Sequence, residues 1–168
     1  MKARVVLLAA VGLLVGGCSS QVAEPPASPT VADASQVDMC TILTDAELTQ
    51  LGIRLDSRKQ VNELGEVGCG WGGQPFTLDL ERGKDTVAAY RARRHDPAFT
   101  SFADNTVNGR AGGHFSVRRD RSDCAQLIDG GAVALVVAVA PAFSLNPRPI
   151  DSCAAALRIA QMIEPRLP

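Results

Sequence analysis

The chain has 168 residues, of which 46% are hydrophobic, 21% are charged and only 4% are aromatic, and its formal net charge is −1. This length and balance suit one globular domain and exclude a collagen-like, coiled-coil or wholly disordered protein. A nearly neutral chain also lacks the basic surface that nucleic-acid binding requires, so nucleic acid is not an expected partner.

Residues 1–17 have the three parts of a secretory signal peptide: basic residues, an apolar run over residues 5–15, and small residues before Cys18. The run would extend about 16 Å as a helix, whereas about 20 residues are needed to cross a membrane. The segment Leu14-Val15-Gly16-Gly17-Cys18 resembles a bacterial lipobox. We therefore expect cleavage before Cys18 and attachment to the outer face of the cell membrane through lipid on that thiol. The alternative is an ordinary signal peptide followed by an incidental cysteine.

The cysteine count supports lipid on Cys18, because the chain has five cysteines and an exported protein rarely leaves one thiol unpaired. Setting Cys18 aside leaves four that lack any Cys-x-x-Cys spacing. In an oxidising compartment, two disulfides are therefore favoured over a zinc site, and we expect no metal or cofactor. The four residues are Cys40, Cys69, Cys124 and Cys153.

After the lipidated cysteine, residues up to Val37 are rich in Pro, Ser and Ala and have no apolar period. Such a segment cannot bury enough surface to fold, so residues 18–37 are predicted to be a disordered tether. A single domain should then occupy residues 38–168, close to the membrane.

The first half of this domain should contain a helix and a hairpin. Thr44 and Glu47 have the spacing of a capping box, which predicts a short helix that ends at Gly52. Residues 66–73 and 76–82 are then predicted to be two strands joined by a Gly-rich turn.

The second half begins with a helix predicted over residues 85–94, capped by Asp85. Strands are expected over residues 113–119 and 124–128. The apolar run over residues 132–140 is typical of a strand buried on both faces, and should form the centre of the sheet. A helical stripe over residues 151–164 predicts a last helix packed on that sheet.

The element order α-β-β-α-β-β-β-α indicates an α+β fold, with an antiparallel sheet of about five strands and helices packed against it. In this layout, we predict that Cys40 pairs with Cys69 and Cys124 with Cys153, because each bond would join a helix start to the sheet. Each bond would close a loop of about 30 residues and contribute roughly 3 to 4 kcal/mol. The two other pairings stay possible.

Three segments, CTILTDAELTQLG, GCGW and DSCAAALRIAQMI, follow the lipobox and tether. In this combination, residues 38 to 166 resemble the actinobacterial lipoprotein family catalogued as domain of unknown function 3558. The resemblance implies an exported α+β domain with paired cysteines, and it implies no established reaction.

Candidate catalytic residues are few. His95 and His114 are better explained as solvated side chains, and no nucleophile elbow, metal-protease helix, phosphate loop or dinucleotide motif is present. Asp79 and Glu81 share one strand face, which we interpret as a solvated sheet edge. We therefore expect a protein that is not an enzyme.

Two other features could bind a ligand. A group of basic side chains could form an anion-binding patch, although interleaved aspartates favour helix capping and edge protection instead. Trp71 could offer a stacking platform, although packing over a disulfide is the more usual role. The basic group consists of Arg91, Arg93, Arg94, Arg118, Arg119 and Arg121.

The leading hypothesis is a lipid-anchored, non-catalytic binding or interaction domain of the cell envelope, whose partner is an envelope protein, an anionic lipid or a wall polymer. A sensory or small-ligand-binding module is the alternative, and an apolar cleft with a few converging polar groups would favour it. A hydrolase comes third and would need Ser, His and Asp side chains brought within hydrogen-bond reach.

Overall fold

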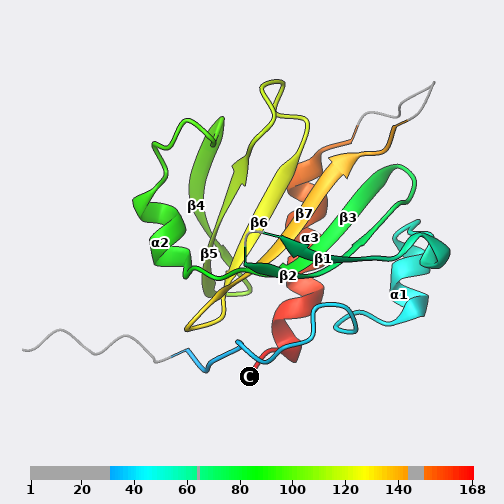
Figure 1. Ribbon diagram of the computed structural model, residues 1–168, viewed down its shortest axis with the longest axis horizontal. Coiled ribbons are helices and arrows are strands. Elements are labelled where there is room, and N and C mark those ends of the chain that lie inside the picture. Colours follow the sequence, from blue (N-terminus) through cyan, green and yellow to red (C-terminus); the bar gives the residue numbers. More distant parts are fainter. Residues whose placement is uncertain (1–30, 64, 144–149) are drawn as a thin grey trace, which may run out of the picture.

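The computed structural model describes residues 31–63, 65–143 and 150–168, so the predicted signal peptide and Cys18 lie outside the described residues. Seven strands form one antiparallel sheet in the order β1-β2-β3-β7-β6-β5-β4 (Figure 1). The strands are β1 (Lys59–Glu63), β2 (Glu66–Trp71), β3 (Phe76–Arg82), β4 (Ser101–Val107), β5 (Arg110–Ser116), β6 (Cys124–Asp129) and β7 (Ala134–Pro141). The helices are α1 (Asp45–Gln50), α2 (Val87–Ala92) and α3 (Ser152–Ile163), with short 3-10 turns η1 (Leu55–Ser57) and η2 (Glu164–Arg166).

The antiparallel α+β architecture is confirmed, but the predicted count of about five strands is wrong. The two additional strands, β1 and β4, are the outermost strands of the sheet and change the predicted element order. Neither has an alternating apolar pattern, because an outer strand here buries few of its side chains. Their hydrogen-bond ladders with β2 and β5 hold them in place.

The apolar run predicted to form the sheet centre does so, as β7. This strand is fourth of the seven and pairs with β3 on one side and β6 on the other. It therefore joins the two halves of the chain into one sheet, and it places β3 in the interior.

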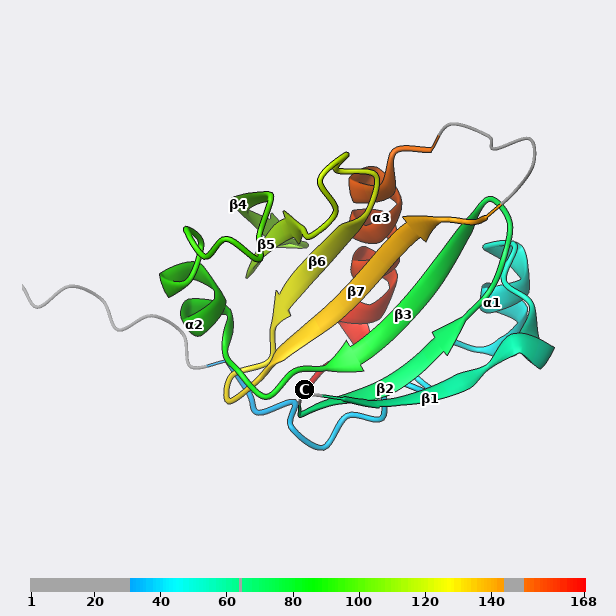
Figure 2. The same cartoon turned by 45° about the horizontal axis from the view of Figure 1, so that its top comes forward.

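One face of the sheet packs against α3, which lies behind the strands in Figure 1 and Figure 2. The helix begins at Asp151, whose carboxylate accepts a hydrogen bond from the Ala154 amide at 2.9 Å. Its Ile159 and Ile163 pack with Leu80 and other side chains of β3 and β7 in the main core. Leu80 and Ile163 are 0% exposed, so we call this side of the sheet the α3 face.

The segment before α1 also closes the α3 face. The predicted capping box is present, because Thr44 accepts from the Glu47 amide and Glu47 accepts from the Thr44 amide. Ala34 is fully buried and donates its amide to the Gly130 carbonyl at 2.9 Å, and Val37 packs on the core. Residues 34–37 of the predicted tether thus pack against the domain.

Two disulfides tie outlying elements to the sheet. Cys40 is bonded to Cys69 on β2, and Cys124 on β6 is bonded to Cys153 in the first turn of α3. The two bonds have the same sequence separation of 29 residues, so each removes a similar amount of entropy from the unfolded chain. Both disulfides lie on the α3 face, and neither crosses the opposite face of the sheet.

The opposite face of the sheet, which we call the open face, is covered only in part. Helix α2 packs Val87 and Tyr90 on side chains of β5 and β6, and Tyr90 stacks on Phe115. The helix is shorter than the predicted 85–94 span, and its cap is Thr86, which accepts from the Ala89 amide at 3.1 Å. Asp85 was the predicted cap, but its carboxylate instead binds Arg93.

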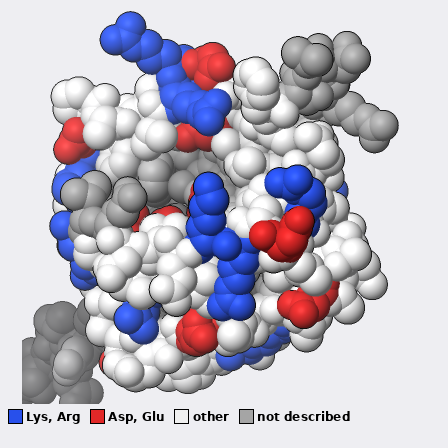
Figure 3. Space-filling model, turned by 45° about the vertical axis from the view of Figure 1, so that its right-hand side comes forward, with Lys and Arg blue, Asp and Glu red and all other residues white. Residues whose placement is uncertain are grey.

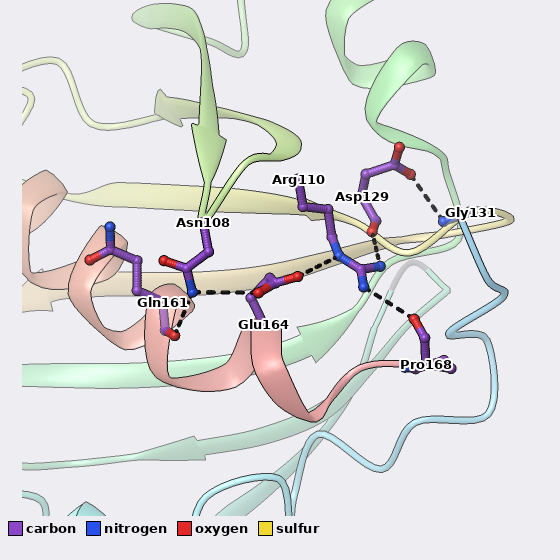
Figure 4. A network of polar contacts seen from close by, with 7 residues as sticks. All are labelled: Asn108, Arg110, Asp129, Gly131, Gln161, Glu164 and Pro168. Carbon is purple, nitrogen blue, oxygen red and sulfur yellow. Dashed lines mark hydrogen bonds and ion pairs between the residues drawn. The ribbon is translucent and has the colours of Figure 1, made fainter. Parts of the chain in front are cut away.

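A polar network joins the β4–β5 hairpin to the end of α3 (Figure 4). Arg110 donates to Glu164 at 3.0 Å, to the Asp129 carbonyl at 3.1 Å and to the Pro168 carbonyl at 3.1 Å. Asn108 donates to the Gln161 carbonyl at 3.0 Å. The charged side chains of this network are satisfied within the protein, which indicates a structural role.

Candidate functional site

The open face of the sheet carries a groove where α2 does not cover it. Two adjoining hollows, of about 760 and about 260 Å³, share Asp79 and Glu81 in their linings. The larger hollow extends toward β1 and η1, and the smaller one extends toward β5 and the β5–β6 loop. Figure 3 shows a hollow on this side of the molecule, with acidic and basic side chains at its border.

Strand register explains why the groove is deep enough to receive a ligand. Side chains alternate between the two faces of a strand, so residues paired across the sheet line up on one face. The residues that pair with Asp79 on the two neighbouring strands are a glycine and an alanine, so no large side chain lies beside it. The row across the sheet is Lys59, Gly70, Asp79, Ala138, Ala125 and Phe115.

Two glycines of β2 lie on the open face close to β3. A Cβ atom at Gly70 would lie 2.2 Å from the Oδ1 atom of Asp79, and one at Gly68 would lie 2.0 Å from the Leu80 carbonyl oxygen. Both approaches are far shorter than van der Waals contact. Strand β2 therefore leaves its open face bare beside the Asp79 carboxylate.

Asp79 is a half-buried carboxylate that has no hydrogen bond or ion pair to any residue in the described parts of the chain. Its cross-strand neighbours, Gly70 and Ala138, have no polar side-chain atoms. Burial raises the pKa of Asp79 above its usual value, because desolvation disfavours the charged form. A desolvated acid in a groove is a candidate for a functional residue.

The other acids of the smaller hollow include two that are engaged within the protein. Glu66 accepts a hydrogen bond from the Tyr90 hydroxyl at 2.8 Å, and burial together with this bond raises the pKa of Tyr90. Asp123 accepts from the Val117 amide at 3.1 Å and from the Ser116 hydroxyl. Burial raises the pKa of Asp123, but these hydrogen bonds outweigh it and the pKa is lowered overall. Both acids therefore hold the walls of the groove.

Comparison with known protein families identifies one family that matches this chain. The model of the family described as "Protein of unknown function (DUF3558)" matches residues 13–166, which is nearly the whole sequence. The chain belongs to this family. No curated protein and no solved structure matches the DUF3558 chain. Because the family description assigns no activity, the functional argument depends on the geometry of the groove.

The structure corrects the interpretation of Asp79 and Glu81 in the DUF3558 domain. We predicted a solvated sheet edge, but β3 lies between β2 and β7 in the interior of the sheet. The strand becomes interior because β7, more than 50 residues later, pairs along its whole length. The two carboxylates thus point into the groove that they line.

The predicted basic patch is divided between two elements of the domain. Near α2, Arg91 pairs with Asp104 at 2.6 Å and Arg93 pairs with Asp85 at 2.7 Å. Arg118, Arg119 and Arg121 belong to the β5–β6 loop, which Figure 1 shows well away from α2. Only Arg118 of this set lines the groove. The arrangement favours local pairing over one anion-binding patch.

The remaining predicted residues lie outside the groove or in the core. His95 is exposed next to Arg94. Trp71 borders the larger hollow, but it is only 4% exposed and belongs to the main core together with Cys69, as expected of a core residue. Within residues 31–63, 65–143 and 150–168, no group of three or more His, Cys, Asp or Glu side chains is arranged to hold a metal ion. No helix in these same ranges has the length and apolar character needed to span a membrane.

Sequence reasoning missed the groove, although one signal for it is present. Over residues 67–73, glycine alternates with Cys69 and Trp71, so one face of the strand carries large side chains and the other carries none. Such a pattern indicates that something approaches the bare face closely. The alanines of β6 and β7 that complete the floor have no comparable signal.

Proposed function

We propose that this DUF3558 chain is a lipid-anchored binding domain of the cell envelope, and that its ligand occupies the groove on the open face. The observation that carries the proposal is the half-buried, unpaired Asp79 in a groove with a floor of small side chains. An interior sheet face is normally covered by a helix or by large side chains. In the part of the chain that the structure describes, neither covers the groove, although burial of the Asp79 carboxylate there costs stability.

The geometry favours a small-molecule ligand over a flat protein contact. The groove combines apolar side chains, such as Phe115 and Val136, with a few polar groups that converge on its centre. This combination is typical of ligand sites, whose volumes are about 300–1,000 Å³. A contact surface for a protein or a wall polymer would instead be flatter and more extended. The small-ligand module therefore becomes the preferred form of the proposal.

Binding without catalysis is the second part of the proposal. In the described parts of the chain, the groove lining contains no histidine and no free thiol, and its one serine, Ser57, bonds with backbone groups. The groups that do converge there are carboxylates and basic side chains. They suit recognition of a charged ligand better than attack on a substrate.

We propose the cellular location of the domain from the predicted signal peptide and the cysteines. A cysteine at position 18 after an apolar run, and two disulfides in the domain, both fit an exported lipoprotein. We expect Cys18→Ser to abolish labelling by a radioactive fatty acid and cleavage before residue 18, with both disulfides retained. Fatty-acid labelling that persists in the variant would contradict the anchor.

Photo-crosslinking in intact cells tests the groove. A photoreactive amino acid replaces Ala140, which lines the smaller hollow, and in a matched control it replaces the exposed Thr49 of α1. We expect an adduct of defined mass at position 140 that is absent at position 49. Adding Ala138→Leu should abolish this adduct, because the larger side chain fills the floor. Identical adducts at both positions would contradict the proposal.

A further inference from the structure

We propose that the groove binds an organic cation, with its ammonium or guanidinium group at Asp79 and an apolar portion over Ala138 and Ala125 toward Phe115. This inference rests on the proposed function, because it assigns a ligand class to the same groove. It follows from the charge of the smaller hollow, from the unpaired carboxylate at its floor, and from the direction in which the floor becomes apolar.

The charge of the smaller hollow favours a cation. Among the residues that the structure describes, four carboxylates and one basic side chain, that of Arg118, line this hollow. Glu66 and Asp123 are engaged by Tyr90 and by the β5–β6 loop, whereas Asp79 has no partner in the described parts of the chain. A bound ammonium or guanidinium group would give Asp79 the charge-assisted hydrogen bonds that the protein does not supply. The four carboxylates are those of Glu66, Asp79, Glu81 and Asp123.

The row of paired residues sets the direction of the ligand. On one side of Asp79 the row passes Gly70 to Lys59, whose charge repels a second cationic group. On the other side it passes Ala138 and Ala125 to Phe115, about three strand spacings or roughly 14 Å away. An apolar body therefore extends from Asp79 toward Phe115, where the lining includes Val136 and Val117.

An anion is the competing ligand class, because Arg54 and Lys59 line the outer part of the larger hollow. An anion held by these two residues would lie beside Asp79 and Glu81, which line the same hollow. Repulsion from two carboxylates in a partly desolvated groove opposes that arrangement. The test therefore compares three probes of similar shape and different charge.

The probes are 2-phenylethylammonium, the neutral 2-phenylethanol and the anionic phenylacetate, titrated by calorimetry into the mature protein in nonionic detergent. Titration of each probe into the same detergent without protein gives the heat of probe that enters the micelles. We expect wild type to bind the cation at least tenfold more tightly than either other probe. Asp79→Asn should weaken cation binding at least tenfold, whereas Asp45→Asn, which removes a charge from the exposed start of α1, should leave it unchanged.

Circular dichroism and disulfide mapping establish that each variant is folded. Wild type that does not bind the cation, or Asp79→Asn that binds it as tightly, would overturn the inference. Binding of phenylacetate or phenylethanol that is as tight as cation binding, and that Ala138→Leu abolishes, would also overturn this inference. The groove would then still be the ligand site. Probe binding that is unchanged in Ala138→Leu would overturn both this inference and the proposed function.

Discussion

The two faces of the sheet differ in whether their side chains have packing or hydrogen-bonding partners within the protein. On the α3 face, Leu78 and Leu80 are fully buried against the helix, and both disulfides attach there. On the open face, the alternating residue Asp79 is flanked by Gly70 and Ala138 and has no partner in the described parts of the chain. One strand thus serves stability with one set of side chains and leaves the other set available to a ligand.

The largest expected effect comes from the α3 face. Leu80→Ala should lower the free energy of unfolding by about 3 kcal/mol, because it leaves a cavity in a core that is 0% exposed. Thr77→Ala, on the open face of the same strand, should cost about 1 kcal/mol, since it removes one methyl group and a hydroxyl that donates to the Ala140 carbonyl. Urea denaturation measures both. Equal losses of unfolding free energy in the two variants would contradict the claim that the α3 face contributes most of the stability.

The network of Figure 4 should contribute the next largest effect. Arg110→Ala should cost about 2 kcal/mol, because it leaves the Glu164 carboxylate, 17% exposed, without its cation. Arg91→Ala is the matched control, because its partner Asp104 is 50% exposed and such pairs contribute about 0–1 kcal/mol. The measurement is thermal unfolding of both variants. A larger loss for Arg91→Ala would show that the network does not hold α3 to the hairpin.

A smaller effect should appear as a pH dependence at α1. The hydrogen bond from Arg166, with those from Thr44, lowers the pKa of Glu47 from 4.5 to about 2. Because the folded pKa lies below the unfolded value, this stabilisation is present above about pH 4.5 and is lost as the pH falls toward 2. Glu47→Gln should therefore unfold with a shallower pH dependence in that window. A melting temperature with the same slope in both proteins would contradict the assignment.

The sequence predicted the elements whose side chains have a strong local signal. The Thr44–Glu47 capping box, the helix that begins at Asp151 and the central apolar strand are confirmed. Strands β1 and β4 were missed because outer strands here have no clear apolar alternation. For β4, Asn108-Gly109 was the available signal: both residues have positive φ, as a tight hairpin turn requires.

The groove could not be predicted from the residue pattern within single strands, because its floor depends on which strands become neighbours in the sheet. Asp79 lies beside Ala138 only because β7 inserts between β3 and β6, and it lies beside Gly70 through the β2–β3 hairpin. Periodicity indicates which face a residue occupies but not which residue pairs with it. The same limit led to the wrong placement of Asp79 and Glu81 at an edge.

The central claim is that Asp79 is kept for a ligand and not for stability. Burial raises its pKa above the unfolded value of 3.8, so its ionisation destabilises the folded state at neutral pH. Thermal unfolding of Asp79→Asn at pH 7 tests this most directly. We predict a higher melting temperature than wild type at pH 7, with a difference that fades as the pH falls toward 3.8 and the wild-type carboxyl becomes protonated. A lower melting temperature at pH 7 would mean that the carboxylate supports the fold, and would contradict the claim.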